Sequence, residues 1–275
     1  MTTGTFRTHD NQDLATQSWE VGQEPRASLI IIHGFGHHGA CFQEVAQHLN
    51  HAGVNVYSFD QRGHGKSPGK RGFINSFDDT ISDVRTFMQS IKANVEGRPL
   101  FLMGHSMGGL VLGVYVLRHA PAVRGLIFSS ALLKIPDSVP PFLIKLAAFL
   151  GKYLPTLPVQ GVNFKAVSRD PAAIEEMLND PLRYTGRMQA RTGAEIGKAI
   201  AELNEGMDRI EDPLLILHGT ADQLTDPSGS KNLYDRSKST DKTLRIFEHG
   251  YHELYNDLDK SAFMTEITDW MLKRS

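Results

Sequence analysis

The chain has 275 residues, 40% of them hydrophobic, so it can bury one large core and still carry an insertion. Its formal net charge of -2 at pH 7 offers no electrostatic attraction for nucleic acid, and its single cysteine, Cys41, excludes a disulfide within the chain. The polar segment 1–12 argues against a secretory signal, and no run reaches the roughly 18 apolar residues of a membrane span, so we expect a soluble, cytoplasmic protein.

The first third of the chain predicts a hairpin followed by alternating strands and helices. Phe6–Val21 alternates loosely around the polar turn Asp10–Asp13, as in a β-hairpin. Ser28–Ile32 and Val54–Phe59 are apolar runs typical of strands that are covered on both faces. Ser76, with an acidic residue three positions later and apolar residues at helical spacing beyond it, predicts the N-cap of a helix.

The same alternation continues to the end of the chain. Further strand-like runs are Leu100–Met103, Gly125–Ser129, Leu214–His218 and Thr243–Phe247, and the last is followed by an amphipathic helix that contains Trp270. Repeated βα units build a mostly parallel sheet with helices on both sides. We therefore predict an α/β fold of this type.

The segment 131–206 interrupts the alternation. It contains only helical patterns separated by prolines, and it is too long for a plain loop in a compact domain. We predict a helical cap inserted between two parts of the core, 1–130 and 207–275. Within it, Phe142–Leu154 is unusually apolar, which fits either a helix in the cap's own core or a lid helix that lines an acyl pocket or enters a lipid surface.

The motif Gly-X-Ser-X-Gly at Gly104–Gly108 ends the apolar run Leu100–Met103 and precedes a helical pattern. This order of strand, tight turn and helix is typical of a nucleophile elbow, which holds a serine in a strained and exposed position. The glycines are needed because neighbouring backbone crowds the turn where a Cβ atom would clash. Since the motif also occurs by chance in loops, Ser106 needs partners elsewhere in the chain.

A serine nucleophile requires a base that takes its proton and an acid that orients the base. In this type of fold the chain order is serine, acid, histidine, with the partners at strand ends. Asp222 and His252 each follow a predicted strand, so we predict the triad Ser106, Asp222 and His252. The alternatives are Asp226, one helical turn after Asp222, and His249, three residues before His252.

An ester hydrolase also needs two backbone N–H groups that stabilise the developing oxyanion. Met107 follows the nucleophile at a helix N-terminus, and the loop His33–Gly39 supplies Phe35 between glycines that allow close approach of the backbone. The histidines of this loop raise the alternative of a metal site. No acidic or cysteine ligand stands near them at a metal-binding spacing, so we predict neither a metal nor another cofactor.

Several short motifs together carry a family resemblance. The first group is His33–Gly36, Phe59–Ser67, Gly104–Gly109 and Gly250–His252. The second group is Asn179–Leu182, Gly219–Leu224 and Asp241–Leu244. The first group resembles the α/β-hydrolase superfamily, and the second resembles, more narrowly, the monoacylglycerol lipases and lysophospholipase-like serine hydrolases. The likeness extends from about residue 5 to residue 272.

The resemblance implies the same nucleophile, acid and base, with Phe35 and Met107 as oxyanion donors. It also implies a hydrophobic cap that admits one acyl chain and rests transiently on a membrane surface. In mammalian-type enzymes of the family, the loop after His-Gly carries an acidic residue and an arginine that handle the glycerol head. His37 and Cys41 stand at those positions here. The predicted substrate contacts are His37, Phe142, Leu146, Phe149, Leu150, Met177, Tyr184 and Tyr255.

Taken together, the motifs predict hydrolysis of a carboxylic ester of a fatty acid through an acyl-enzyme. A monoacylglycerol, cleaved to glycerol and fatty acid, is the expected substrate, and no nucleic acid is expected as a partner. The alternatives are a broad-specificity carboxylesterase, a lysophospholipase and, in a different class, a hydrolase-fold binding module without catalysis. The intact set of serine, acid and histidine argues against the last of these.

Overall fold

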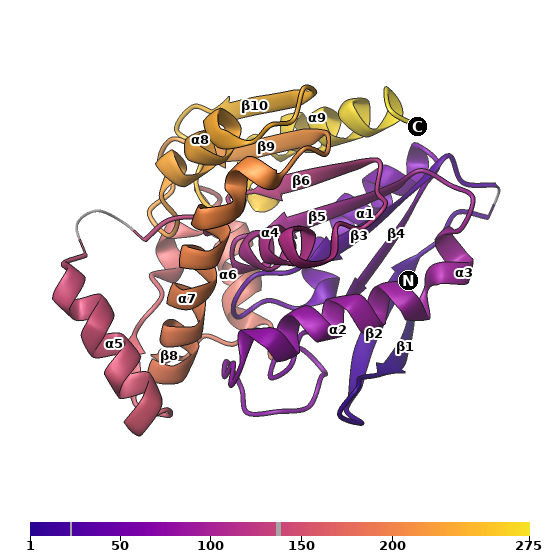
Figure 1. Ribbon diagram of the computed structural model, residues 1–275. Coiled ribbons are helices and arrows are strands. Elements are labelled where there is room, and N and C mark those ends of the chain that lie inside the picture. The colour runs from indigo at the N-terminus through magenta and orange to yellow at the C-terminus, as the bar shows by residue number, and fades with distance from the viewer. Residues whose placement is uncertain (23, 136–138) are drawn as a thin grey trace.

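The computed structural model of the chain describes residues 1–22, 24–135 and 139–275, without the side chains of residues 141, 143–145 and 160. Its centre is an eight-stranded sheet in the order β1-β2-β4-β3-β5-β6-β9-β10 (Figure 1). β2 runs antiparallel to β1 and to β4, and all other neighbours in the sheet are parallel. The strands are β1 (Thr2–Arg7), β2 (Asp13–Trp19), β3 (Ala27–Ile32), β4 (Val54–Phe59), β5 (Leu100–His105), β6 (Gly125–Ser129), β9 (Leu214–Gly219) and β10 (Lys242–Phe247).

The apolar runs of the sequence correspond to the strands of this sheet. β1 and β2 form the predicted hairpin, although it begins at Thr2 rather than at Phe6. β3, β4, β6 and β9 are buried at every residue because helices cover both faces of the sheet. The Ser76 side chain accepts a hydrogen bond from the amide of Asp78, which confirms the predicted N-cap.

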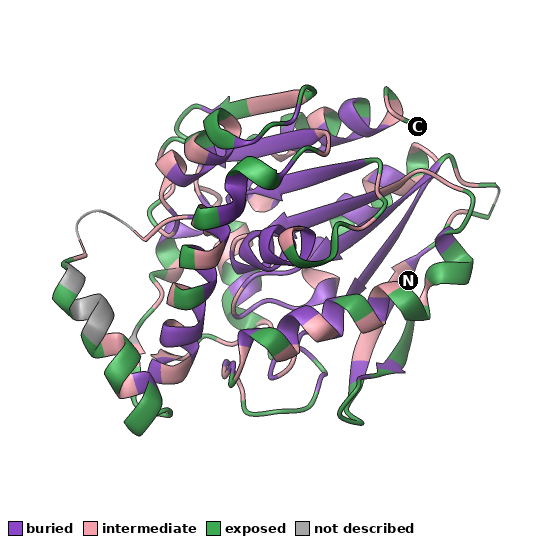
Figure 2. Cartoon of the chain, in the orientation of Figure 1, coloured by how far each residue is buried: buried purple, intermediate pink, exposed green. Residues whose placement is uncertain are grey.

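Helices cover the sheet on both sides and create two apolar cores. They are α1 (Gln43–His51), α2 (Phe77–Ser90), α3 (Lys92–Val95), α4 (Met107–His119), α5 (Pro141–Tyr153), α6 (Pro171–Asn179), α7 (Ala190–Gly206), α8 (Pro227–Arg236) and α9 (Lys260–Leu272). Since side chains alternate along a strand, Ile30 and Ile32 face the core formed with α2, α4 and α7, whereas Leu29 and Ile31 face the core formed with α1 and α9. Figure 2 shows the buried central strands of the sheet between these partly exposed helices, while the edge strands β1 and β10 are mostly exposed or half-buried.

Residues 131–206, which we call the cap, lie between β6 and β9 and contain α5, α6 and α7. The prediction of helices alone was incomplete, because the short strands β7 (Pro158–Gln160) and β8 (Met188–Gln189) pair antiparallel. Strands of two or three residues are too short to show an alternating pattern in the sequence. In the described part of the chain, no helix combines the length and the apolar character that crossing a membrane would require.

Candidate active site

Ser106 lies in the turn between β5 and α4, where the sequence predicts a nucleophile elbow. Its backbone has φ 55° and ψ -122°, a strained conformation for a residue with a side chain. A Cβ atom on Gly108 would stand 2.0 Å from the carbonyl oxygen of Ile32, and one on Gly104 would stand 2.4 Å from the carbonyl oxygen of Gly108. The turn therefore closes only with glycine at both positions, and this packing fixes the place of Ser106.

Asp222 and His252 lie together, as the sequence predicts. His252 Nδ1 is 2.8 Å from Asp222 Oδ2, and the two side chains are 4% and 0% exposed. The His252 ring lies 4.9 Å from the ring of His105, the residue before Ser106. Within the part of the chain that the structure describes, the Ser106 hydroxyl and His252 Nε2 form no hydrogen bond with each other or with another residue. Catalytic hydrogen bonds of this kind often tighten only when a substrate is bound.

Asp222 has further partners that the sequence argument missed. His218 Nε2 lies 3.2 Å from Asp222 Oδ2, and the Thr225 hydroxyl donates to the same oxygen at 2.7 Å. The other oxygen accepts the amides of Leu224 and Thr225 at 2.8 and 3.0 Å. These contacts orient the carboxylate toward His252. The only sequence signal for His218 was its position at the end of a buried strand.

The two alternative triad members are excluded by their positions. Asp226 caps α8, because its side chain accepts the amide of Ser228 at 2.9 Å. The His249 side chain is 81% exposed and lies in a left-handed turn with φ 58°. Asp222 and His252 are therefore the acid and the histidine that the fold brings together.

Burial and charge have opposite effects on this pair. Burial disfavours the charged form of Asp222, but the charge and hydrogen bonds of His252 and His218 outweigh it and lower the pKa of Asp222. Burial likewise disfavours the charged form of His252, but the charge and hydrogen bond of Asp222 outweigh it and raise the pKa of His252 above 6.5. The arrangement keeps Asp222 ionised and stabilises an imidazolium, which a general base becomes when it accepts a proton.

The two predicted oxyanion donors lie on either side of the elbow. Met107 is the first residue of α4, so its amide points out of a helix N-terminus. A Cβ atom on Gly34 would stand 2.9 Å from the Ser106 Cβ, so the loop that carries Phe35 lies directly against the nucleophile. Neither amide donates a hydrogen bond to another described residue, which leaves both free for a ligand oxygen.

Comparison with known proteins identifies the family of the chain. Residues 23–259 match the Hydrolase_4 family, described as serine aminopeptidase, S33. The chain belongs to this family. A Mycolicibacterium smegmatis monoacylglycerol lipase is 31% identical over 92% of this chain and 91% of its own length, and the human monoglyceride lipase is 30% identical over 97% and 89%. The crystal structure of the Paleococcus ferrophilus monoacylglycerol lipase is 32% identical, with a TM-score of 0.85 over 95% of this chain and 99% of that one.

This member of the Hydrolase_4 family has the fold that the sequence predicts, the α/β-hydrolase fold. Its mostly parallel sheet and flanking helices match those of lipases and esterases. The cap closes over the edge of the sheet that carries the elbow. There the amide of Tyr184 in the cap donates to the carbonyl of Gly36 at 2.9 Å, and the Tyr184 ring meets the Phe35 ring edge-on at 5.7 Å.

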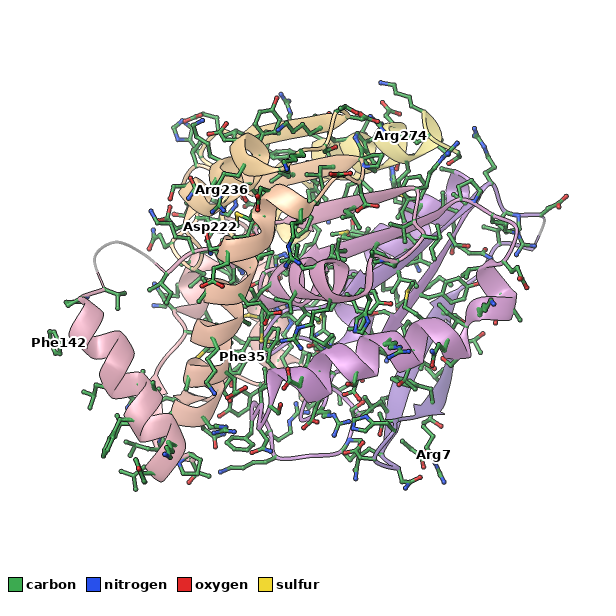
Figure 3. All side chains as sticks on the ribbon, in the orientation of Figure 1. Arg7, Phe35, Phe142, Asp222, Arg236 and Arg274 are labelled. Atoms are coloured by element: carbon green, nitrogen blue, oxygen red, sulfur yellow. The ribbon has the colours of Figure 1, made fainter. Side chains whose placement is uncertain are left out.

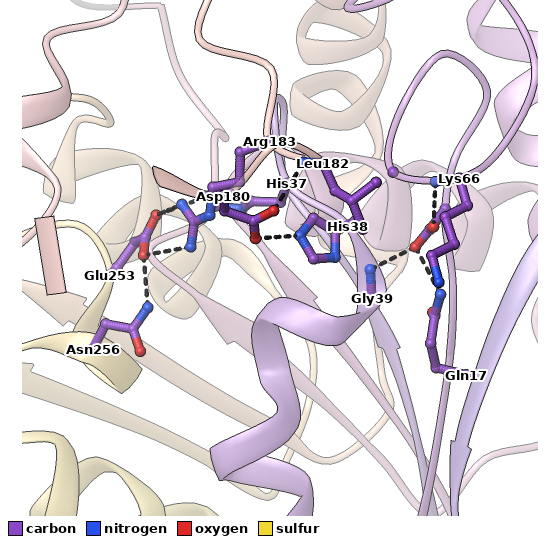
Figure 4. A network of polar contacts seen from close by, with 12 residues as sticks. Gln17, His37, His38, Gly39, Lys66, Asp180, Leu182, Arg183, Glu253 and Asn256 are labelled. Atoms are coloured by element: carbon purple, nitrogen blue, oxygen red, sulfur yellow. Dashed lines mark hydrogen bonds and ion pairs between the residues drawn. The ribbon is translucent and has the colours of Figure 1, made fainter. Parts of the chain in front are cut away.

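A buried charge network joins the cap to the loop that carries His252 (Figure 4). Glu253 Oε1 accepts from Arg183 of the cap at 2.7 Å and lies 2.8 Å from His37 Nε2, while Oε2 accepts from Asn256 at 2.9 Å. Burial opposes the charge on Glu253, but Arg183 and His37 outweigh it and hold its pKa well below the ordinary value. Burial and the charge of Arg183 lower the pKa of His37 to about 4, so the imidazole is neutral at pH 7.

Glu253 engages His37 Nε2, so only Nδ1 of this ring remains for a contact with substrate. The His37 ring stacks on His105 at 5.3 Å, and its Nδ1 is buried with no hydrogen-bond partner among the described residues. That atom and the Ser106 Cβ lie 3.1 and 2.9 Å from the point where a Cβ on Gly34 would stand. Nδ1 of His37 thus lies close to the nucleophile, and its contact with a substrate stays a prediction.

Three large apolar side chains of the cap helix α5 are exposed rather than enclosed in a pocket. Phe142 is 65% exposed, Leu146 45% and Phe149 57%, while Leu150 is half-buried. Figure 3 shows the Phe142 side chain directed away from the rest of the molecule. In this position of the cap, the three exposed side chains face solvent, and their role in lining an acyl pocket stays a prediction. α5 packs on α7 through Gly151, where a Cβ would stand 2.6 Å from the Ala194 Cβ.

The remaining predicted substrate contacts differ from one another. Met177 is buried in α6, and Tyr184 lies beside Phe35 at the oxyanion loop, which suits a substrate contact. Tyr255 is only 1% exposed, and its ring packs on Phe42 at 4.7 Å. The prediction that Tyr255 contacts substrate is therefore corrected. It belongs to the apolar core on the α1 and α9 face of the sheet, where its ring meets the His105 ring edge-on with 5.1 Å between the ring centroids.

The fold also brings potential metal ligands together where the sequence argument saw none. Asp180 of the cap lies 142 positions from His38 in the chain, and its Oδ2 lies 2.8 Å from His38 Nε2. Cys41 lies one turn after His38 and completes the group. Burial opposes the charged form of His38, but Cys41 and Asp180 outweigh it and raise the pKa of His38 to about 9. The expectation that no acidic or cysteine ligand lies near these histidines is therefore wrong.

Proposed function

We propose that the protein hydrolyses monoesters of fatty acids, with a monoacylglycerol cleaved to glycerol and free fatty acid through an acyl-enzyme on Ser106. The observation that carries this proposal is the buried Asp222–His252 pair, 2.8 Å apart, beside the strained elbow of Ser106. The names of two relatives suggest the substrate class, since the Mycolicibacterium smegmatis protein is named a monoacylglycerol lipase and the human protein a monoglyceride lipase.

In the acylation step, the Ser106 hydroxyl attacks the ester carbonyl while His252 Nε2 takes the proton from the hydroxyl. Asp222 holds the ring through Nδ1 and stabilises the imidazolium, which agrees with the raised pKa of His252. The amides of Phe35 and Met107 would stabilise the negative charge that develops on the carbonyl oxygen. His252 then returns the proton to the glycerol oxygen that leaves.

In the deacylation step, His252 takes a proton from a water molecule that attacks the acyl-enzyme, and the fatty acid leaves from Ser106. Both steps use the same base and the same two amides. No step requires a metal or another cofactor.

The proposal includes the cap as a lid that contacts lipid surfaces transiently. Phe142, Phe149 and Tyr153 are 65%, 57% and 59% exposed on α5, and Lys152 lies over the Tyr153 ring at 5.2 Å. The Phe149 and Tyr153 rings pack together at 4.7 Å, and exposed apolar side chains that gather on a surface mark an interaction site. Aromatic residues beside a lysine suit the interface between lipid tails and headgroups. A cytoplasmic protein of this kind would bind membranes only peripherally.

The test is to measure kcat/KM on monoacylglycerols of increasing chain length, on diacylglycerols and triacylglycerols, on short esters and on lysophospholipids. We expect a preference for monoacylglycerols, and Ser106→Ala should lower kcat by about 10⁶-fold. Ser261→Ala, on the exposed face of α9, is the matched control and should leave kcat unchanged. Equal rates on short esters would favour a broad carboxylesterase. Failure of Ser106 to react with an organophosphonate would favour a binding module.

A further inference from the structure

A cluster of three potential metal ligands lies at the junction of the core and the cap. His38 and Cys41 come from the core, at the 3₁₀ turn η1 (Gly39–Phe42), and Asp180 comes from the cap, directly after α6. The ligating atoms of the three residues lie within 4.8 Å of one another. Figure 4 shows the Asp180 carboxylate facing the His38 ring. None of the three residues takes part in the hydrolysis proposed above.

The donor atoms suit a zinc-like ion. An imidazole nitrogen, a thiolate and a carboxylate oxygen are the ligands that Zn²⁺ takes, and in a tetrahedral site such ligands stand roughly 3.3–3.5 Å apart. His38 Nε2 and Asp180 Oδ2, now at 2.8 Å, would separate slightly as the ion enters. Asp180 and Cys41 are half-buried, so an ion can reach the site and keep one water molecule as its fourth ligand.

The cluster is held in place by contacts outside it. Asp60 Oδ1 accepts the amide of Gly39 at 2.8 Å, and the amide of Cys41 donates to the carbonyl of His38 at 3.1 Å. In the cap, Asp180 Oδ1 accepts the amide of Leu182 at 2.8 Å, which leaves Oδ2 for the shared site. Such outer contacts orient metal ligands and strengthen binding.

The positively charged Arg183 of the cap interacts electrostatically with Asp180 and Cys41. The guanidinium of Arg183 is engaged by Glu253 through hydrogen bonds of 2.7 and 3.2 Å. On binding, the ion would displace the ring proton of His38 and the thiol proton of Cys41, and the thiolate together with the carboxylate of Asp180 would balance its charge of two. We propose that His38, Cys41 and Asp180 bind a single Zn²⁺-like cation that ties the cap to the core.

The test uses the full chain, stripped of metal with a chelator and then titrated with Zn²⁺ by calorimetry and with Co²⁺ by absorption. We expect one ion per chain, a thiolate-to-cobalt charge-transfer band and a rise in Tm with Zn²⁺. Cys41→Ser should abolish the band. Asp180→Asn should weaken Zn²⁺ binding by more than the roughly 10–100-fold that loss of an outer contact costs, while its Oδ1 still accepts the Leu182 amide.

The control is His51→Ala, which removes an exposed histidine at the end of α1 and should leave binding unchanged. The absence of the cobalt band, or Zn²⁺ binding equal in wild type and Cys41→Ser, would overturn the site. Binding that is unaffected by Asp180→Asn would overturn the link to the cap. Because the readouts are spectroscopic and calorimetric, they are independent of whether the protein hydrolyses monoacylglycerols.

Discussion

Two glycines in helices show how differently the elbow and the cap are built. Gly108 lies in the first turn of α4, and a Cβ there would stand 2.0 Å from a backbone oxygen of β3. Gly197 lies in the middle of α7 in the cap, and a Cβ there would meet nothing within 4 Å. The elbow is therefore fixed by contacts between backbone segments, which cannot yield. The cap helix has open space at Gly197, so it allows a small substitution there that the elbow does not allow at Gly108.

The largest expected effect is chemical and lies in the core. Asp222→Asn should lower kcat by about 10⁴-fold, because the amide no longer stabilises the imidazolium or selects the correct tautomer of His252. Steady-state kinetics on a monoacylglycerol measures this, and KM should change little. Asp226→Asn is the matched control, since asparagine caps a helix as well as aspartate. A loss below tenfold in Asp222→Asn would show that another residue is the acid.

The second largest effect, on the free energy of unfolding, is expected at the ion pair between Arg183 of the cap and Glu253 of the core. Arg183→Met should cost about 3–5 kcal/mol in the free energy of unfolding, because it leaves the Glu253 carboxylate buried without its counter-ion. Urea unfolding followed by circular dichroism measures this. Adding Glu253→Gln to Arg183→Met removes the stranded charge and should restore most of the stability. If Arg183→Met alone is as stable as wild type, then His37 and Asn256 suffice to hold Glu253.

The same glycine substitution should have opposite signs in the two regions. Gly108→Ala should destabilise the protein by about 2 kcal/mol, because the new methyl group meets a carbonyl that cannot move. Gly197→Ala should stabilise it by roughly 0.5–1 kcal/mol, since alanine is the better helix former and has open space there. Urea unfolding measures the free energy of unfolding of both variants. A change of the same sign in the two would contradict the prediction.

The smallest effect on stability is expected on the outer face of the cap. Phe142→Ser combined with Phe149→Ser should change the free energy of unfolding by less than about 0.5 kcal/mol, because both side chains are exposed. Binding to phospholipid vesicles should fall about tenfold or more, since two apolar anchors are lost. Leu258→Ser, an equally exposed apolar residue outside the cap, is the control and should leave vesicle sedimentation unchanged.

The features of the fold that depend on a local sequence pattern could be predicted from the sequence. The buried strands appear as apolar runs, and the elbow appears as glycines around a serine, because each depends on neighbours in the chain. Asp222 and His252 were found because they follow strands that end at the same edge of a parallel sheet.

The contacts between distant segments could not be predicted in this way. Glu253 meets His37 across 216 positions and Arg183 across 70, and a charge pattern does not reveal which partner the fold supplies. Tyr255 was misassigned because an aromatic residue near the predicted catalytic histidine, His252, fits a pocket wall and a core equally well. The exposure of Phe142 was undetermined for a similar reason, since an apolar helix fits a buried position and a lipid-facing one.

The hydrogen bond from the amide of Tyr184 to the carbonyl of Gly36 has a mechanical consequence. Gly36 is the residue after Phe35, the predicted oxyanion donor. A displacement of Tyr184 away from the sheet would therefore either break this hydrogen bond or move the peptide next to Phe35. If the cap moves to admit a substrate, as the proposed lid function requires, the peptide next to the predicted oxyanion donor Phe35 would move with it or lose this contact.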